Sequence, residues 1–210
     1  MDWNVNQTAI VAASIGATAG LTGVVIGSLL TWIREVWSAR RTRTDHARYL
    51  AIRVACVLDR YVGKCAEVVD DDGLSYGQRN EQGYLEPQVK TPDAPKFPND
   101  LDWNSIEHTM AYKILSMSNE AEAADSKISS ISEYVASPPD FEEYFQERAD
   151  QYSKLGLAAL AITQALREKY KLPSQEFGDW NPADRLTKAK LEVEADRKKR
   201  SQMLPLRASS

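Results

Sequence analysis

The hydrophobic pattern begins with an uncharged stretch at residues 8–33, which is 26 residues long. A helix needs roughly 20 predominantly apolar residues to cross a hydrocarbon core about 30 Å thick. The preceding segment, 1–7, has Asp2 and no Lys or Arg, whereas a cleaved signal peptide has a positively charged start and a shorter apolar core. The pattern therefore predicts a transmembrane helix at 8–33 after a short extracytoplasmic segment at 1–7.

Positive charge is concentrated on the C-terminal side of this stretch. No Lys or Arg precedes it, and arginines follow it at once. The positive-inside rule then places the rest of the chain in the cytoplasm, so we expect a single-pass protein of the cell membrane. Tryptophans at the same boundary fit an aromatic belt, and the arginines can contact anionic membrane lipid. The expected interface and topology residues are Trp32, Trp37, Arg34, Arg40, Arg41 and Arg43.

Small residues inside the stretch share one face of the predicted helix. At about 100° per residue, Gly16, Gly20, Gly23 and Gly27 fall within roughly 60° of one another. In lipid, such a face lets two helix backbones approach closely. We expect a homo-oligomer formed through these four glycines. Association with a different membrane protein, or none at all, is the alternative, because glycine is common in membrane helices.

The pattern of apolar residues three and four apart continues beyond the uncharged stretch. No Pro or Gly occurs between Ser28 and Val62, which predicts that the helix continues as a basic juxtamembrane segment at 34–73, helical to about Val69. The aspartates at 70–72 are interpreted as a solvated helix end, because the alternating ligands of a calcium loop are absent. Residues 74–103 lack periodicity and predict a long irregular loop, either partly disordered or functional.

Two long apolar seams dominate residues 104–172. Apolar residues recur at alternating spacings of three and four over 106–135 and again over 141–166. Two prolines separate the seams, so the pattern predicts an antiparallel helical hairpin with coiled-coil-like packing. The second helix has the broader apolar face and is expected at the centre of the bundle.

Charges on the helix predicted at 141–166 have different expected roles. Arg148 is the only charge in its seam, and we expect it to pair with a carboxylate that fixes the register of the helices. Binding of an acidic ligand is the alternative. Glu143 and Glu147 are expected to face solvent and to complement the helix macrodipole.

The last segment, 173–210, predicts a turn, a helix and a tail. Pro182 suits a first helical turn, and the helix is expected to reach about Arg200. Its apolar positions are sparse, so we expect it at the surface or frayed. The whole pattern predicts an all-α chain with a single N-terminal transmembrane helix continuing into a cytoplasmic antiparallel helical bundle.

Composition adds little chemistry to this pattern. The net charge of −4 argues against general nucleic-acid binding, which needs a basic face. Cys56 and Cys65 are nine residues apart on one predicted helix, so they point to opposite sides and do not bridge each other. His46 and His108 lack metal-ligand spacings, and no phosphate-binding or hydrolase motif is present. We expect no catalytic residue, no cofactor and no metal.

The function that this pattern favours is a non-enzymatic interaction or scaffold protein. It would self-associate through the glycine face and present a cytoplasmic bundle to a protein partner that the sequence does not name. The alternative is an oligomerising membrane effector that permeabilises the membrane, of a defence or lysis type. An enzyme is the least favoured reading, and nucleic acid is not an expected partner.

Overall fold

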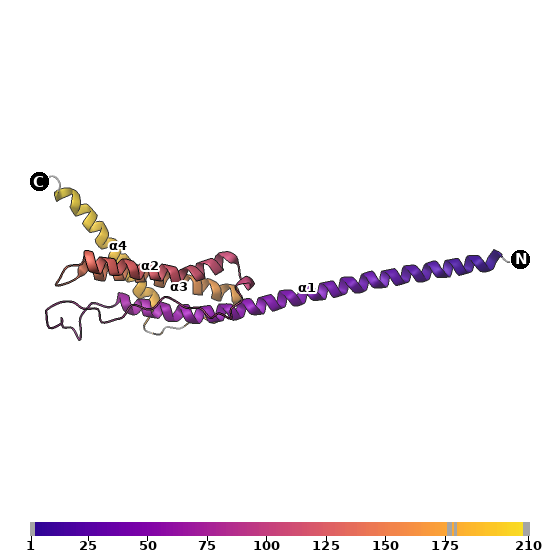
Figure 1. The fold of residues 1–210 in the computed structure, drawn as a ribbon, viewed down its shortest axis with the longest axis horizontal. Helices are drawn as coiled ribbons and strands as arrows, with labels where there is room; N and C mark the ends of the chain where they lie inside the picture. Colours follow the sequence, from indigo (N-terminus) through magenta and orange to yellow (C-terminus); the bar gives the residue numbers. More distant parts are fainter. Residues whose placement is uncertain (1–2, 176–177, 179, 208–210) are drawn as a thin grey trace. The chain divides into compact units, whose positions relative to one another are not determined.

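The chain is helical throughout its folded elements, as predicted (Figure 1). The computed structural model describes the backbone of residues 3–175, 178 and 180–207, and the side chains of 31–38, 40–175, 178 and 180–202. The elements are α1 (Trp3–Val69), the 3₁₀ turn η1 (Trp103–Ser105), α2 (His108–Tyr134), α3 (Glu142–Tyr170) and α4 (Pro182–Arg207). These elements divide between two compact units, residues 1–46 and 47–210.

The first unit contains the N-terminal part of α1, which is helical from Trp3. Among the residues whose side chains the structure describes, no helix has the length and apolar character needed to cross a membrane. The span predicted at 8–33, with its four glycines, lies outside the described side chains up to residue 30. Both the span and the glycine face therefore stay predictions.

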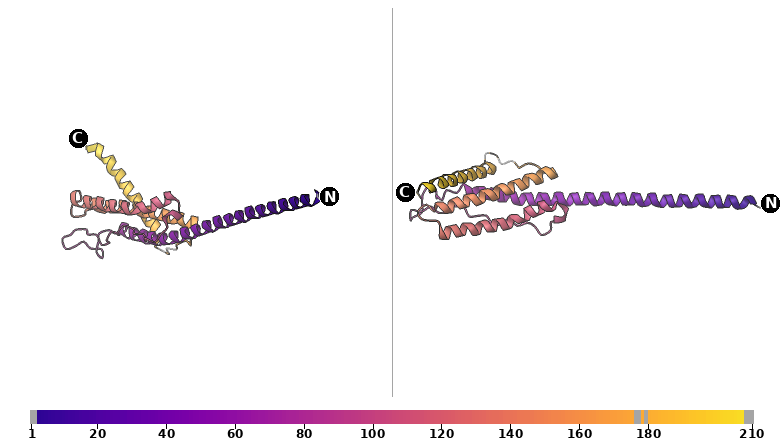
Figure 2. Two further views of the ribbon diagram at one scale, coloured as in Figure 1. Left: turned by 45° about the vertical axis from the view of Figure 1, so that its right-hand side comes forward. Right: turned by 90° about the horizontal axis from the view of Figure 1, so that it is seen from above.

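The second unit is a helical bundle with one apolar core. The part of α1 from Ala47 onward lies beside α2 and α3, and α4 packs on α3 (Figures 1 and 2). The helix ends at Val69, as predicted. Gly73 follows with a φ of 74°, and a Cβ there would lie 2.5 Å from the Phe145 ring. Glycine suits both the positive φ and the lack of space for a Cβ, and it lets the chain turn sharply against α3.

The seams predicted for the helical hairpin form the contact between α2 and α3. Fully buried seam positions include Ile114 and Met117 on α2 and Tyr152 and Leu166 on α3. The first helix begins four residues later than the predicted boundary at 104. Asp102 accepts a hydrogen bond from the backbone N–H of Asn104 and starts η1 instead.

Helix α3 is the central element, as its broad apolar face predicted. It packs against α2 on one side and α4 on the other. Its Gly156 lies where three helices meet, because a Cβ there would be 2.7 Å from Leu186 of α4 and 3.0 Å from the Cβ of Cys65 on α1. The missing side chain lets α4 approach α3 closely.

The last helix has mostly exposed residues, as expected of a surface element, but its few apolar positions are buried and it continues to Arg207 rather than ending near Arg200. Leu186, Ala189 and Val193 are all buried in the bundle. These three positions lie on one face at spacings of three and four, which suffices because Gly156 leaves room for Leu186.

The long connection at 74–103 is irregular, as predicted, and it lies against the bundle. It contains an isolated β-bridge between Ser75 and Gln78, and the backbone N–H of Leu85 donates to the Pro139 carbonyl at 3.0 Å. Leu101 is buried, and Val89 and Phe97 pack partly against the core. These contacts show a packed loop rather than a detached linker.

Candidate functional site: a groove between α2 and α3

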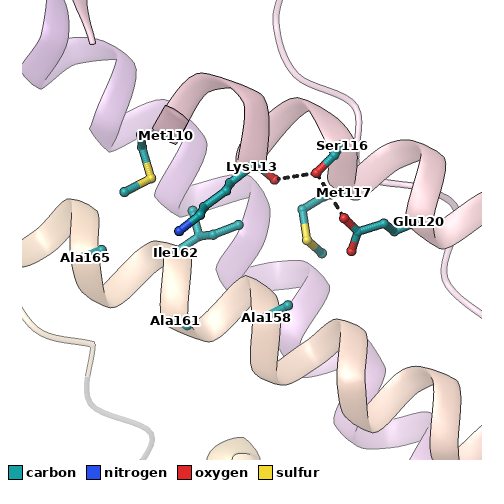
Figure 3. Close-up of a pocket in the computed structure, with 9 residues that line it drawn as sticks. All are labelled: Met110, Lys113, Ser116, Met117, Glu120, Ala158, Ala161, Ile162 and Ala165. Carbon is teal, nitrogen blue, oxygen red and sulfur yellow. Dashed lines mark hydrogen bonds between the residues drawn. The ribbon is translucent and has the colours of Figure 1, made fainter. Parts of the chain in front are cut away.

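An apolar groove lies between α2 and α3, seen with α1 behind it (Figure 3). It encloses about 280 Å³. Five residues of α2 and four of α3 line it. They are Met110, Lys113, Ser116, Met117 and Glu120 of α2, and Ala158, Ala161, Ile162 and Ala165 of α3.

The sequence opens this groove by placing small residues beside the seam of α3. Ala158, Ala161 and Ala165 recur at spacings of three and four, so they share the edge of α3 next to α2. Met117 and Ile162 are both buried, and they close the floor of the groove against the core. A shallow channel with methyl groups along one wall can accept the side chains of another helix.

The α2 wall carries the polar groups of the groove. The Ser116 hydroxyl lies 3.0 Å from Oε1 of Glu120 and 3.1 Å from the Lys113 carbonyl, so it can donate to either. Lys113 extends from this wall across the groove toward α3 (Figure 3). The groove is therefore apolar at its floor and charged along one rim.

A buried ion pair anchors α3, the helix that forms one wall of the groove, to the segment after α1. Nη1 of Arg148 on α3 lies 2.9 Å from the carboxylate of Asp71, and the two side chains are 2% and 1% exposed. Nη2 of Arg148 donates to the Val89 carbonyl at 2.6 Å. The expected carboxylate partner of Arg148 is thus confirmed, and it belongs to Asp71, two residues beyond the end of α1.

The interpretation of residues 70–72 as a solvated helix end is wrong for Asp71, whose side chain is buried. Its carboxylate also accepts backbone N–H groups of Gly73, Gln88 and Val89 at 3.0–3.2 Å. Burial alone raises the pKa of Asp71, but these N–H groups and Arg148 outweigh it, and the pKa lies below its ordinary value. One carboxylate thereby joins α1, the loop and α3.

A second ionic cluster joins α4 to α3, and Glu147 belongs to it rather than to the solvent-facing surface that was expected. Lys127 of α2 pairs with Glu147 at 2.6 Å, and Arg197 of α4 approaches the same carboxylate at 3.6 Å. The Asp150 carboxylate forms two ion pairs, with Nζ of Lys154 and Nη2 of Arg197, each at 2.7 Å. Burial raises the pKa of Asp150, whereas the two cations lower it, and the net pKa is below its ordinary value.

The buried phenols and thiol of the core are held protonated at neutral pH. Burial raises the pKa of Cys65 and Tyr61 well above their ordinary values. Burial also raises the pKa of Tyr152, whose hydroxyl donates to Asp125 at 2.6 Å. A protonated buried thiol is a poor nucleophile, so these groups contribute packing rather than reactivity. Both cysteines are free, as predicted.

The residues predicted from sequence as interface and topology residues lie on the surface of α1. Trp32 and Trp37 are 62% and 74% exposed, and the four arginines at 34, 40, 41 and 43 are exposed as well. Gly16, Gly20, Gly23 and Gly27 fall among the residues whose side chains are not described. No group of His, Cys, Asp and Glu able to hold a metal occurs among the described residues.

The sequence predictions did not include the groove. The alanine spacing on α3 was the one available signal, and it is indistinguishable from an ordinary helix edge until α2 is placed beside it. Comparison of the chain with protein-family models, with curated proteins and with solved structures gave no match.

Proposed function

We propose that the chain is a single-pass, membrane-anchored helical interaction protein of the cell membrane, with its bundle in the cytoplasm. Residues 8–33 form the anchor, the glycine face joins copies into a homo-oligomer, and the bundle docks a protein partner. The observation that carries the proposal is the uncharged stretch at 8–33 followed at once by arginines. A stretch of that length suits a bilayer, and the arginines suit its cytoplasmic face.

Two features of the described residues support this proposal. Arg34, Arg40 and Arg41 are exposed, which suits contact with anionic lipid headgroups. The α2–α3 groove offers an apolar surface shaped for a helix.

The experiment is crosslinking of the full chain in isolated membranes, with dye leakage measured in the same cells. We expect the parent to be in the membrane fraction and to crosslink. Changing Gly20→Ile and Gly23→Ile together should abolish crosslinking, because each branched side chain would stand where a neighbouring backbone fits. Membrane helix contacts are each worth about 1 kcal/mol, so one substitution alone is too small a change.

Val25→Ile, on the opposite face of the predicted helix, is the matched control and should leave crosslinking unchanged. A parent absent from the membrane fraction would overturn the anchor. A double variant that crosslinks like the parent would overturn the glycine face. Leakage in the parent that disappears in the double variant would favour the permeabilising effector over the interaction protein.

A further inference from the structure

The rim of the α2–α3 groove carries one charge of each sign, two helical turns apart. Lys113 and Glu120 are seven residues apart, so they lie on the same edge of α2 at axial positions about 10 Å apart. Within the described residues neither forms an ion pair, and Glu120 accepts only the hydrogen bond of the Ser116 hydroxyl. Ion pairs within a helix join residues three or four apart, so these two charges cannot neutralise each other along α2.

We propose that this groove docks a second copy of the chain, groove against groove, with the two α2 helices antiparallel. This rests on the proposed function, which it extends by naming the partner that the bundle binds. A two-fold axis through the middle of the groove reverses the axial order of the two charges. Lys113 of each copy then faces Glu120 of the other, and both pairs form at once.

The opposite orientation is disfavoured by the same charges. A parallel arrangement in register brings Lys113 against Lys113 and Glu120 against Glu120, and like charges facing each other across an interface oppose association. The rim therefore selects both the partner and its direction. No other helix needs to be assumed, because the complementary pattern is already present on this surface.

The α3 wall of the groove suits close approach of a second copy. Ala158, Ala161 and Ala165 present only methyl groups, so the partner's helix can approach the backbone of α3. Met110, which is only partly buried, has a flexible side chain that can fill the space that the partner leaves (Figure 3). Docking removes apolar surface from water and encloses the charge pairs, which fix orientation more than affinity.

The groove contact is separable from the glycine contact of the proposed anchor. The groove lies in the unit 47–210, and the glycines lie in the unit 1–46. A full chain carrying Gly20→Ile and Gly23→Ile therefore isolates the groove contact. Each proposal can then fail without the other.

The test measures self-association of this full chain in non-ionic detergent by energy transfer between dyes on Cys56, the exposed thiol. Lys113→Glu alone and Glu120→Lys alone should each weaken association by about tenfold or more, because each makes both facing pairs repulsive. Mixing the two variants should restore association. The first then supplies only carboxylates and the second only cations at the paired positions.

Glu122→Lys is the matched control, since it makes the same charge change about 200° round α2 from Glu120. It should leave association unchanged. Circular dichroism of each variant shows whether it folds, and recovery on mixing excludes a folding defect directly. A monomeric parent, single reversals that associate like the parent, or a mixture as weak as its components would each overturn the proposal.

Discussion

Replacing Asp71 by Ala removes the carboxylate that joins α3 and the loop at 74–103 to the end of α1. The carboxylate accepts one hydrogen bond from Arg148 and others from three backbone N–H groups. Arg148 keeps only the Val89 carbonyl after this change, in a site where its side chain is 2% exposed. Breaking a buried pair by removing one partner costs about 3–5 kcal/mol, and Asp71→Ala should fall in that range.

Arg148→Met should cost less, about 1–3 kcal/mol, although it breaks the same ion pair. Methionine keeps most of the apolar stem, although it loses the guanidinium group that lies 5.5 Å from the ring centre of Tyr144 and 5.8 Å from that of Phe145. Asp71 also keeps its backbone donors, so its charge stays solvated by N–H groups. The double variant should cost less than the sum of the two single variants, because it leaves neither charge unpaired.

The assay is chemical unfolding of the full chain in non-ionic detergent, followed by circular dichroism. Asp72→Ala is the control, since its exposed side chain accepts one local bond from the N–H of Leu74, and it should cost less than about 1 kcal/mol. An Arg148→Met variant as unstable as Asp71→Ala, or a strictly additive double variant, would refute the asymmetry that we derive from the backbone donors.

The pH dependence of stability gives a second test of the role of Asp71. Its pKa is lowered in the folded chain, so its contribution is fully present above the unfolded value near 4 and is lost as pH falls through the folded value. The stability difference between parent and Asp71→Asn should therefore be constant from neutral pH to about pH 5 and shrink below about pH 4. A difference that grows on acidification would mean that the pKa is raised instead.

Two further substitutions, each with a contrasting control, test how α4 is attached. Gly156→Val should destabilise the bundle by about 1–3 kcal/mol in the same unfolding assay, because the new side chain would meet Leu186 and Cys65. Gly63→Ala, where an added Cβ would have no neighbour within 4 Å, should instead stabilise α1 by up to about 1 kcal/mol. Asp150→Asn should weaken the ion pairs with Lys154 and Arg197, lower the free energy of unfolding by about 1–3 kcal/mol and speed proteolysis within α4. Asp196→Asn removes only an exposed ion pair with Lys199, so it should change neither stability nor proteolysis.

The apolar seams were readable from the sequence because helix periodicity and burial report the same property. Ile114 and Leu166 lie in predicted seams and are fully buried. The end of α1 at Val69 was readable because the apolar stripe stops there and aspartates follow. That Arg148 needs a carboxylate also followed from its place in an apolar seam.

Which carboxylate it would be did not follow, because Asp71 is 77 residues away along the chain. Locally, the three aspartates at 70–72 resemble any charged helix end, and only the placement of α3 distinguishes the middle one. Glu147 was misjudged for the same reason, since its partners Lys127 and Arg197 come from other helices. Long-range ionic partners depend on tertiary placement and leave no periodic signal.

A polar contact between α2 and α3 also bears on the geometry of the candidate docking groove. The apolar seams of the two helices repeat every seven residues, so a slide of one repeat, about 10 Å, would keep apolar residues facing each other. Such a slide would carry the buried Tyr152 of α3 away from Asp125 of α2, which accepts its hydroxyl at 2.6 Å, and would leave that hydroxyl without its partner. This hydrogen bond therefore favours one register, and that register places Ala158, Ala161 and Ala165 opposite the α2 rim. The position of Lys113 and Glu120 relative to the α3 wall of the groove thus depends on a contact made elsewhere between the two helices, between Tyr152 and Asp125.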